Sequence, residues 1–293
     1  SPADIAELRD LVRAQGADVP IIAKIEKREA LASFDDILAA SDAVMVARGD
    51  LGVETPAEEV PFHQKRIIAA CNQAGKPVIT ATQMLDSMIH NPRPTRAEAS
   101  DVANAVFDGT DAVMLSGETA IGHDPAAVVR TMATVSERAE SEASYRQWAD
   151  RLGRIQRLSH HEKMSSIDPI TAALTHAASR AASEAEVSAI LCCTRSGRTA
   201  RAMARFRPTA AMIGLSPDPT VVRSMSLSWG ITPLQVDLYG TTDEMVWFAV
   251  ETALQAGLVR SGDRVLVLAG APDPNRERPA GAATDVLRIV SVD

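Results

Sequence analysis

Short apolar runs along the chain end repeatedly on charged or hydroxyl residues. Three of them are 22–26 (IAKIE), 42–50 (DAVMVARGD) and 78–84 (VITATQM). Runs of this length, rich in Val, Ile and Ala, are typical of buried parallel strands. Ligands bind where the carboxyl ends of such strands meet. The pattern therefore predicts one functional rim, and the side chains expected on it are Lys24, Glu26, Arg48, Asp50 and Thr82.

Strand and helix signals alternate over residues 1–150, which predicts parallel βα units. Strands are expected at 20–26, 43–48, 77–82 and 111–117. Helices are expected at 3–15, 28–40, 57–74, from Thr95 to Gly109, and from Pro125 to about Trp148. Gly75 and Gly109 are predicted C-caps, and Thr95 with Glu98 forms a predicted capping box. Four such units make half of an eight-unit barrel.

Apolar periodicity is lost over residues 150–166, so we place a domain boundary there. The second block, 151–293, begins with a helix at about 168–186, which Asp168 caps. Strands are expected at 188–194, 210–215, 232–237, 263–269 and 286–292, and helices near 197–206, 218–228 and 241–256. This pattern predicts a small three-layer α/β domain.

The rim residues suggest specific chemistry. Glu26 and Asp50 suit a hard divalent cation such as Mg²⁺ or Mn²⁺, although acids at strand ends also form ordinary salt bridges. Lys24 lies two residues before Glu26 and so points to the same face. It either stabilises a developing oxyanion or only neutralises Glu26.

The other rim residues have two interpretations each. The Thr82 hydroxyl can bind a carboxylate or relay a proton, but threonine is common in any strand. Gly49 allows close backbone approach, and the N–H groups of Gly49 and Asp50 can bind a carboxylate. Arg48 either steers phosphate or braces the rim. Ser116 and Glu118, after the fourth strand, either support the lysine and metal side or are structural.

The composition and net charge of the chain disfavour some classes of function. Hydrophobic residues make up 46% and charged residues 23% of the 293 positions, as in a globular protein. The net charge of −8, without a basic block, disfavours nucleic-acid binding. No apolar run approaches the roughly 20 residues needed to cross a bilayer. The three cysteines show no disulfide or metal spacing, which favours buried thiols in a reducing cytoplasm.

Five motifs occur in a fixed order: ARGDLG at 47–52, ATQMLDSM at 81–88, NPRPTRAE at 91–98, MLSGETA at 114–120 and CTRSGRTA at 193–200. In these motifs the chain resembles the pyruvate kinase family from about residue 20 to its end. The resemblance implies the second half of a (β/α)8 TIM-type barrel followed by an effector-binding α/β domain. It also implies phosphoryl transfer from phosphoenolpyruvate to ADP, giving pyruvate and ATP.

The resemblance assigns roles to individual residues. Glu26 and Asp50 match the ligands of Mg²⁺ or Mn²⁺, and Lys24 matches the catalytic lysine. Thr82 falls in a catalytic motif, and the turn at Gly49 and Asp50 matches the one that holds the substrate carboxylate. A phosphorylated allosteric effector would bind Thr194, Arg195, Ser196, Gly197, Arg198 and Thr199, with the Pro/Gly-rich segment 270–281 as a gate. The family also implies K⁺ and a homo-oligomer.

The resemblance has one departure, at the front of the chain. The family normally carries a first half-barrel and a lid domain before this point, whereas this chain opens on Ser-Pro. We therefore expect a fragment, a processed product or a partial gene. The alternatives to a kinase are a metal-dependent pyruvate aldolase or lyase, and a non-catalytic effector-binding fragment. Our hypothesis is that the half-barrel is inactive alone and that two copies could pair into a pseudo-barrel.

Overall fold

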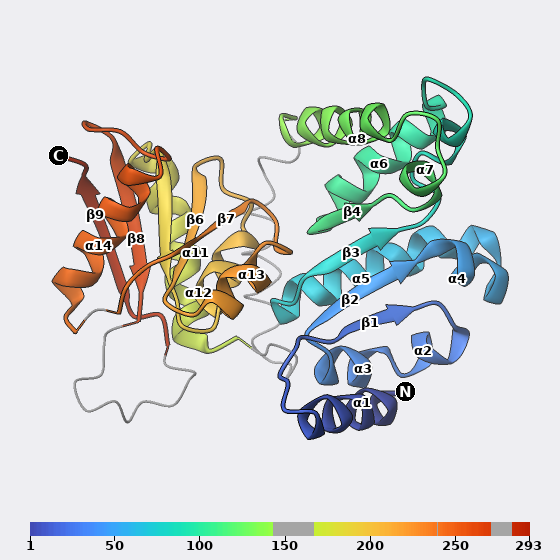
Figure 1. Ribbon diagram of the computed structural model, residues 1–293, viewed down its shortest axis with the longest axis horizontal. Helices are drawn as coiled ribbons and strands as arrows, with labels where there is room; N and C mark the ends of the chain where they lie inside the picture. The colour runs from blue at the N-terminus through green and yellow to red at the C-terminus, as the bar shows by residue number, and fades with distance from the viewer. Residues whose placement is uncertain (143–166, 239, 271–282) are drawn as a thin grey trace. The chain divides into compact units, whose positions relative to one another are not determined.

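The computed structural model describes residues 1–142, 167–238, 240–270 and 283–293. The chain divides into two compact units, Ser1–Tyr145 and Arg146–Asp293 (Figure 1). The predicted boundary at 150–166, the predicted helix end near Trp148 and the segment 271–281 lie outside the described residues. The division of the chain into domains 1–150 and 151–293 therefore stays a prediction.

The first unit is built on a parallel sheet. Its described strands are β1 (Ile22–Ile25), β2 (Ala43–Ala47), β3 (Val78–Ala81) and β4 (Ala112–Met114), hydrogen-bonded in the order β1-β2-β3-β4. The register pairs Lys24 with Met45 and Ala47 with Ala81, so the carboxyl ends of the strands lie at one edge. This arrangement confirms the α/β class and the half-barrel expected from four βα units.

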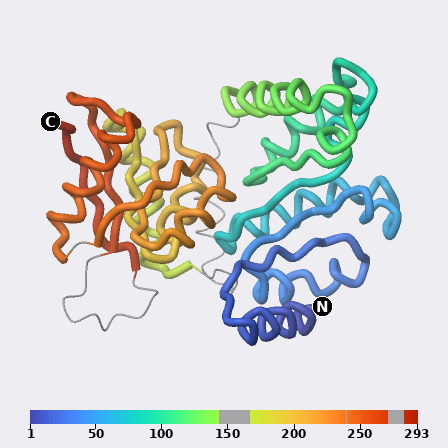
Figure 2. Tube along the Cα trace, in the orientation of Figure 1, coloured from blue at the N-terminus to red at the C-terminus, as the bar shows by residue number. Residues whose placement is uncertain are grey.

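One helix precedes β1 and others follow each strand of the first unit, as the trace in Figure 2 shows. They are α1 (Pro2–Ala14), α2 (Arg28–Ala32), α3 (Phe34–Ala40), α4 (Arg48–Glu54), α5 (Val60–Ala74), α6 (Arg96–Asp108), α7 (Gly117–Ala120) and α8 (Pro125–Glu140), with 3-10 turns at Ala57–Glu59 and Asp86–Ile89. Val44 and Val46 of β2 pack in one apolar cluster with Ile67 and Ile68 of α5. One face of the sheet is thus covered by helices, and this covered face forms the core.

The predicted caps set several helix ends. Gly75 and Gly109 end α5 and α6 with φ of 67° and 92°, which is the left-handed conformation that favours glycine. Thr95 and Glu98 form the predicted capping box at the start of α6. These local signals confirm both ends of α6 and the end of α5.

Three features of the first unit differ from the prediction. The expected helix 28–40 is broken at Ser33, whose φ is −106° and ψ is 22°. The break is invisible in the apolar pattern because Leu31, Phe34 and Leu38 keep helical spacing across it and are all buried. Helices α4 and α7 are not predicted by the sequence, since both are short and glycine-containing and begin within three residues of a strand end.

The second unit is a three-layer α/β fold, as expected. Its described strands are β5 (Ala189–Cys193), β6 (Ala211–Ser216), β7 (Ile231–Gln235), β8 (Arg264–Ala269) and β9 (Val286–Ser291), in the order β7-β6-β5-β8-β9. Only β9 runs antiparallel to its neighbour among these described strands. Its described helices are α11 (Pro169–Glu184), α12 (Arg198–Ala204), α13 (Pro219–Met225) and α14 (Thr242–Gln255). Asp168 caps α11 as predicted.

Strand β5 is buried on both faces. Ile190 and Cys192 pack with residues of α11, α12 and α13, whereas Leu191 and Cys193 pack with residues of α14. The third cysteine, Cys71, lies in the core of the first unit on α5. All three thiols are free and buried, as the cysteine spacing in the sequence predicted.

Within the described part of the chain, no helix combines the length and the apolar character that spanning a membrane requires.

Candidate active site at the carboxyl ends of the strands

One ammonium group lies between two carboxylates at the rim of the first sheet. Lys24 is on β1, Glu26 follows that strand, and Asp50 is in the first turn of α4. Lys24 Nζ lies 2.9 Å from Asp50 Oδ2 and forms a second ion pair with Glu26 Oε2. The exposed fractions of the three side chains are 50%, 33% and 57% for Lys24, Glu26 and Asp50. The structure therefore brings these three residues to one solvent-accessible point.

The alternation of β1 explains why Lys24 faces the rim. Ala23 and Ile25 are buried in the core, so Lys24 between them points to the opposite, exposed face. The hydrogen bond with Glu26, followed by that with Asp50, raises the pKa of Lys24. The hydrogen bond from Lys24 also lowers the pKa of Asp50. Lys24 is thus a cation and Asp50 an anion at neutral pH.

The two carboxylates fit a divalent cation. Mg²⁺ prefers oxygen ligands and keeps several water or substrate oxygens rather than taking a full protein cage. Glu26 and Asp50 already converge on one cationic centre, the Lys24 ammonium. Within the described residues no group of three or more His, Cys, Asp or Glu side chains is placed to hold a metal ion. A pair of protein carboxylates, completed by water or substrate oxygens, matches the coordination that Mg²⁺ prefers.

The turn after β3 lies against the turn after β2. The Gly49 N–H donates to Thr82 Oγ1 at 2.7 Å, and the Thr82 hydroxyl donates to the Ala81 carbonyl at 2.6 Å. A Cβ atom at position 49 would lie 3.4 Å from Thr82 Oγ1, which is an ordinary van der Waals contact, so this approach does not by itself require glycine. The Gly49 amide, expected to bind a substrate carboxylate, is engaged by Thr82 in this structure.

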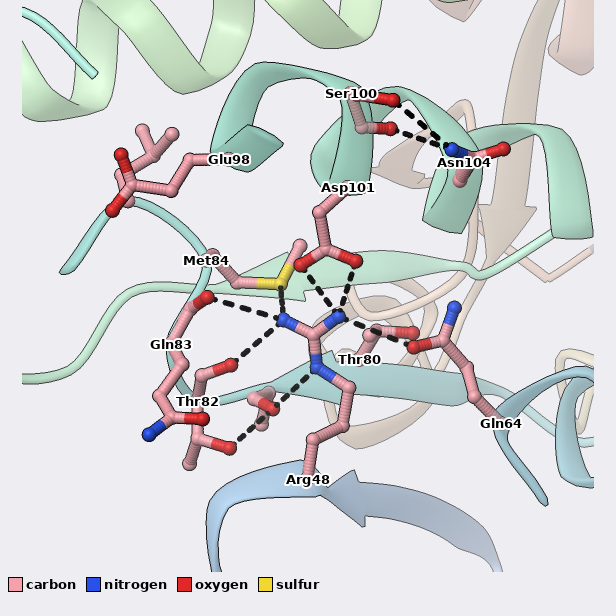
Figure 3. A network of polar contacts seen from close by, with 12 residues as sticks. Arg48, Gln64, Thr80, Thr82, Gln83, Met84, Glu98, Ser100, Asp101 and Asn104 are labelled. Carbon is pink, nitrogen blue, oxygen red and sulfur yellow. Dashed lines mark hydrogen bonds and ion pairs between the residues drawn. The ribbon is translucent and has the colours of Figure 1, made fainter. Parts of the chain in front are cut away.

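The Arg48 side chain is turned inward and is only 9% exposed. Its Nη1 atom donates to Asp101 on α6 at 2.7 Å and to Gln64 on α5 at 3.3 Å. Its other N–H groups face backbone carbonyls of the turn after β3 (Figure 3). Arg48 is also a predicted catalytic residue, with phosphate steering and bracing of the rim as its two possible roles, and these contacts favour bracing.

Glu118 connects two loops of the rim. Glu118 is 2% exposed, and its carboxylate accepts hydrogen bonds from the Leu85 N–H at 3.1 Å and the Ser116 N–H at 2.7 Å. The Ser116 hydroxyl is buried and has no hydrogen-bond partner among the described residues. Glu118 therefore holds the backbone after β3 and β4, which is the structural role considered for it.

Sequence reasoning did not single out Asp101 and Gln64, the two side chains that hold Arg48. Asp101 lies four residues before Ala105, which is fully buried, so it is on the inward side of α6. Gln64 is 4% exposed on α5. One sequence signal could have identified Asp101. It is a polar residue at a core-facing helical position in the segment 100–106 (SDVANAV), and a buried polar side chain needs a hydrogen-bond partner.

The second predicted site is the loop between β5 and α12. Gly197 has a φ of 78° and precedes α12. Arg195 and Arg198 are exposed, whereas Thr194 and Thr199 are buried. The two exposed arginines place positive charge beside the N-terminus of α12, which has only seven residues.

Two hydrogen bonds hold this loop. The Thr199 and Thr284 hydroxyl oxygens lie 2.8 Å apart, and Arg201 donates to the Ser196 carbonyl at 2.6 Å. The structure therefore places all six predicted loop residues in one ordered strand-to-helix turn. Two positively charged side chains of this turn, Arg195 and Arg198, lie on the surface.

Comparison with known proteins covers both units. The family model described as "Pyruvate kinase, barrel domain" matches residues 1–129, and the one described as "Pyruvate kinase, alpha/beta domain" matches residues 172–290. A protein named pyruvate kinase from Clostridium acetobutylicum is 47% identical over 100% of this chain and 59% of its own length. One from Geobacillus stearothermophilus is 49% identical over 92% of this chain and 44% of its own length. Pyruvate kinase 2 of Synechocystis is 45% identical over 99% of this chain and 46% of its own length. The chain thus spans about half the length of the curated relatives it matches.

Proposed function

This chain belongs to the pyruvate kinase family, and we propose that it supplies the metal-binding and proton-handling side of a pyruvate kinase active site. The observation that carries the proposal is the convergence of Glu26 and Asp50 on the Lys24 ammonium. The reaction transfers the phosphoryl group of phosphoenolpyruvate to ADP. It breaks the bond between phosphorus and the enol oxygen, forms a bond to a terminal ADP oxygen, and protonates the released enolate at its methylene carbon.

Charge stabilisation is the task proposed for the Lys24 ammonium. The transferring phosphoryl group and the enolate both carry negative charge, and a fixed cation next to them lowers the barrier. Glu26 and Asp50 would hold Mg²⁺ or Mn²⁺, which neutralises negative charge on the substrate when bound. A lysine that stabilises the enolate is a poor proton donor to it, so the proton must come through another group.

The Thr82 hydroxyl is the proposed candidate for that group. It is fixed between the Gly49 N–H and the Ala81 carbonyl, on the turn next to the one that carries Asp50. From there it would relay a proton through water or bind the substrate carboxylate. A substrate carboxylate at Gly49 would have to replace the hydrogen bond from Gly49 to Thr82.

The remaining parts of the proposal follow from the family and concern the whole protein. They are ADP as acceptor, K⁺ as a second cation, a homo-oligomer and a phosphorylated effector. The exposed Arg195 and Arg198 beside the backbone turn at Gly197 support effector binding through a phosphate. Three buried free thiols support a reducing cytoplasm as its location. The matches above give no support to the aldolase or lyase alternative.

Pyruvate formation from phosphoenolpyruvate and ADP with Mg²⁺ or Mn²⁺ tests the proposal. In the paired half-barrels that would assemble a working site, we expect Lys24→Met to reduce turnover by at least about 100-fold, as for loss of a group that stabilises transition-state charge. Lys27→Met is the matched control, because Lys27 is an exposed lysine just beyond the same strand.

Equal turnover in the two variants would contradict the role of Lys24. A folded chain without any turnover would reject independent catalysis by these 293 residues. It would favour the non-catalytic, effector-binding alternative.

A further inference from the structure

The turn after β3 has a backbone conformation that its residues do not favour. Thr82 and Gln83 have φ of 70° and 54°, so two consecutive non-glycine residues are left-handed. This region is costly for residues with a Cβ atom, and most of all for a β-branched residue such as threonine. Such a turn persists only where surrounding contacts hold it in place.

Arg48 supplies contacts of that kind along the whole turn. Its Nε atom donates to the Ala81 carbonyl at 3.3 Å, and Nη2 donates to the Thr82 carbonyl at 2.8 Å and the Gln83 carbonyl at 3.4 Å. One rigid, planar guanidinium therefore spans three successive carbonyls (Figure 3). A flexible ammonium could not match this set.

The guanidinium is itself anchored from the opposite side. Asp101 on α6 accepts from Nη1 at 2.7 Å, and Gln64 on α5 accepts from the same atom at 3.3 Å. Gln64 in turn donates to Asp108 at 3.1 Å. The position of the Arg48 guanidinium is thus fixed by two helices of the half-barrel as well as by the turn after β3.

We propose that Arg48 and Asp101, here called the Arg48–Asp101 clamp, act as positioning residues that hold the left-handed Thr82–Gln83 turn. The clamp keeps Thr82 Oγ1 within 2.7 Å of the Gly49 amide and so sets the relative placement of the two turns on the rim. The consequence for catalysis rests on the proposed function, whereas the conformational claim does not. Arg48 then has no role as a phosphate ligand, because its donors face the protein.

The conformational claim is tested by NMR on selectively Thr- and Gln-labelled protein. Three-bond HN–Hα couplings together with intraresidue HN–Hα distances separate left-handed from right-handed residues. We expect Arg48→Lys and Asp101→Asn each to remove the left-handed φ at Thr82 and Gln83. If Arg48→Lys does not fold, Asp101→Asn decides the question alone.

The controls are Arg9→Lys and Asp42→Asn, which alter a similar pair in the same unit. Arg9 Nη2 donates to Asp42 Oδ2 at 2.9 Å and to the Ala40 carbonyl at 3.0 Å, away from the turn after β3. We expect both controls to keep the left-handed φ at Thr82 and Gln83. Retention of that φ in folded Arg48→Lys and Asp101→Asn would overturn the proposal.

Turnover provides the second readout. We expect either clamp variant to lower kcat about 100-fold through misplacement of the rim, with little change in the KM for phosphoenolpyruvate. The double variant Arg48→Lys/Asp101→Asn should lose no more than the worse single variant, because both residues act as one unit. Independent, multiplying losses would overturn the joint action. If the unaltered chain forms no pyruvate, the proposed function fails while the NMR measurement still decides the clamp.

Discussion

At the scale of single residues, Lys24 has a second consequence. Its ammonium occupies the point on which Glu26 and Asp50 converge, so it stands where a divalent cation would bind. A bound metal ion would have to displace that ammonium from at least one carboxylate. The lysine that is proposed to assist catalysis therefore also competes with the metal when substrate is absent.

We expect Lys24→Met to bind Mn²⁺ about two- to fivefold more tightly than the unaltered chain, the range for loss of one exposed ion pair. Electron paramagnetic resonance of free Mn²⁺ measures this affinity without substrate or turnover. Lys27→Met serves again as control and should leave the affinity unchanged. Weaker Mn²⁺ binding in Lys24→Met would show that the lysine does not compete with the ion.

The sequence predicted part of this site for a physical reason. Lys24 and Glu26 share a face because strand side chains alternate, and Asp50 follows the neighbouring strand, so their meeting point could be foreseen. The partners of Arg48 could not, since Asp101 is 53 positions away in sequence and contacts it only once α6 has packed. The left-handed turn at Thr82 was equally hidden, because neither Thr nor Gln is typical of that conformation.

At the scale of elements, periodicity and caps predicted most helices and strands of the described chain. The misses include α4, α7, the 3-10 turn Asp86–Ile89 and the break at Ser33, for which the apolar pattern carries no signal. The antiparallel direction of β9 could not be predicted from the sequence either. Its neighbours along the chain, 271–282, lie outside the described residues.

The start of α6 allows a stability prediction. Glu98 accepts hydrogen bonds from the Ser87 and Thr95 N–H groups, both at 2.7 Å, and so joins the capping box to the turn after β3. Burial raises the pKa of Glu98, but these bonds and those from the two hydroxyls outweigh it and leave the pKa below its usual value. The stabilisation is fully present above the unfolded-state pKa of about 4.3 and is lost as pH falls through the folded-state value.

We therefore expect Glu98→Gln to lower the free energy of unfolding by about 1 kcal/mol at pH 7, as for loss of a helix cap. The difference from the unaltered chain should narrow as the pH falls below about 4.3. Urea unfolding at several pH values measures both effects. Glu142→Gln, which removes an exposed ion pair with Arg138, should cost less than half as much at pH 7. A pH-independent effect of Glu98→Gln would contradict the electrostatic part of this account.

At the scale of the whole molecule, the first sheet has two edges. Strands β1 and β4 lie at its ends, and among the described residues no further strand pairs with either. Unpaired strand edges bind other strands readily. The predicted pairing of two half-barrels would use these edges.

We expect the average mass of this 293-residue chain in light scattering to rise with protein concentration. Ile22→Lys should reduce the association, because a lysine on an edge strand opposes pairing and Ile22 of β1 is 40% exposed. Leu8→Lys alters a similarly exposed apolar residue that lies on helix α1 rather than on an edge strand, and it should leave the mass unchanged. A strictly monomeric chain at every concentration would reject the pairing hypothesis.

Each unit contains at least one buried cysteine, whose chemical modification can show when that unit opens locally. Cys71 is in the core of the first unit, and Cys192 and Cys193 are on the central strand of the second. Burial raises the pKa of Cys71 and Cys192, and raises that of Cys193 to about 12, so the reactive thiolate is scarce in the folded chain. Thiol reagents therefore modify each cysteine only when its surroundings open, and mapping the modified cysteine distinguishes the opening of one unit from that of the other.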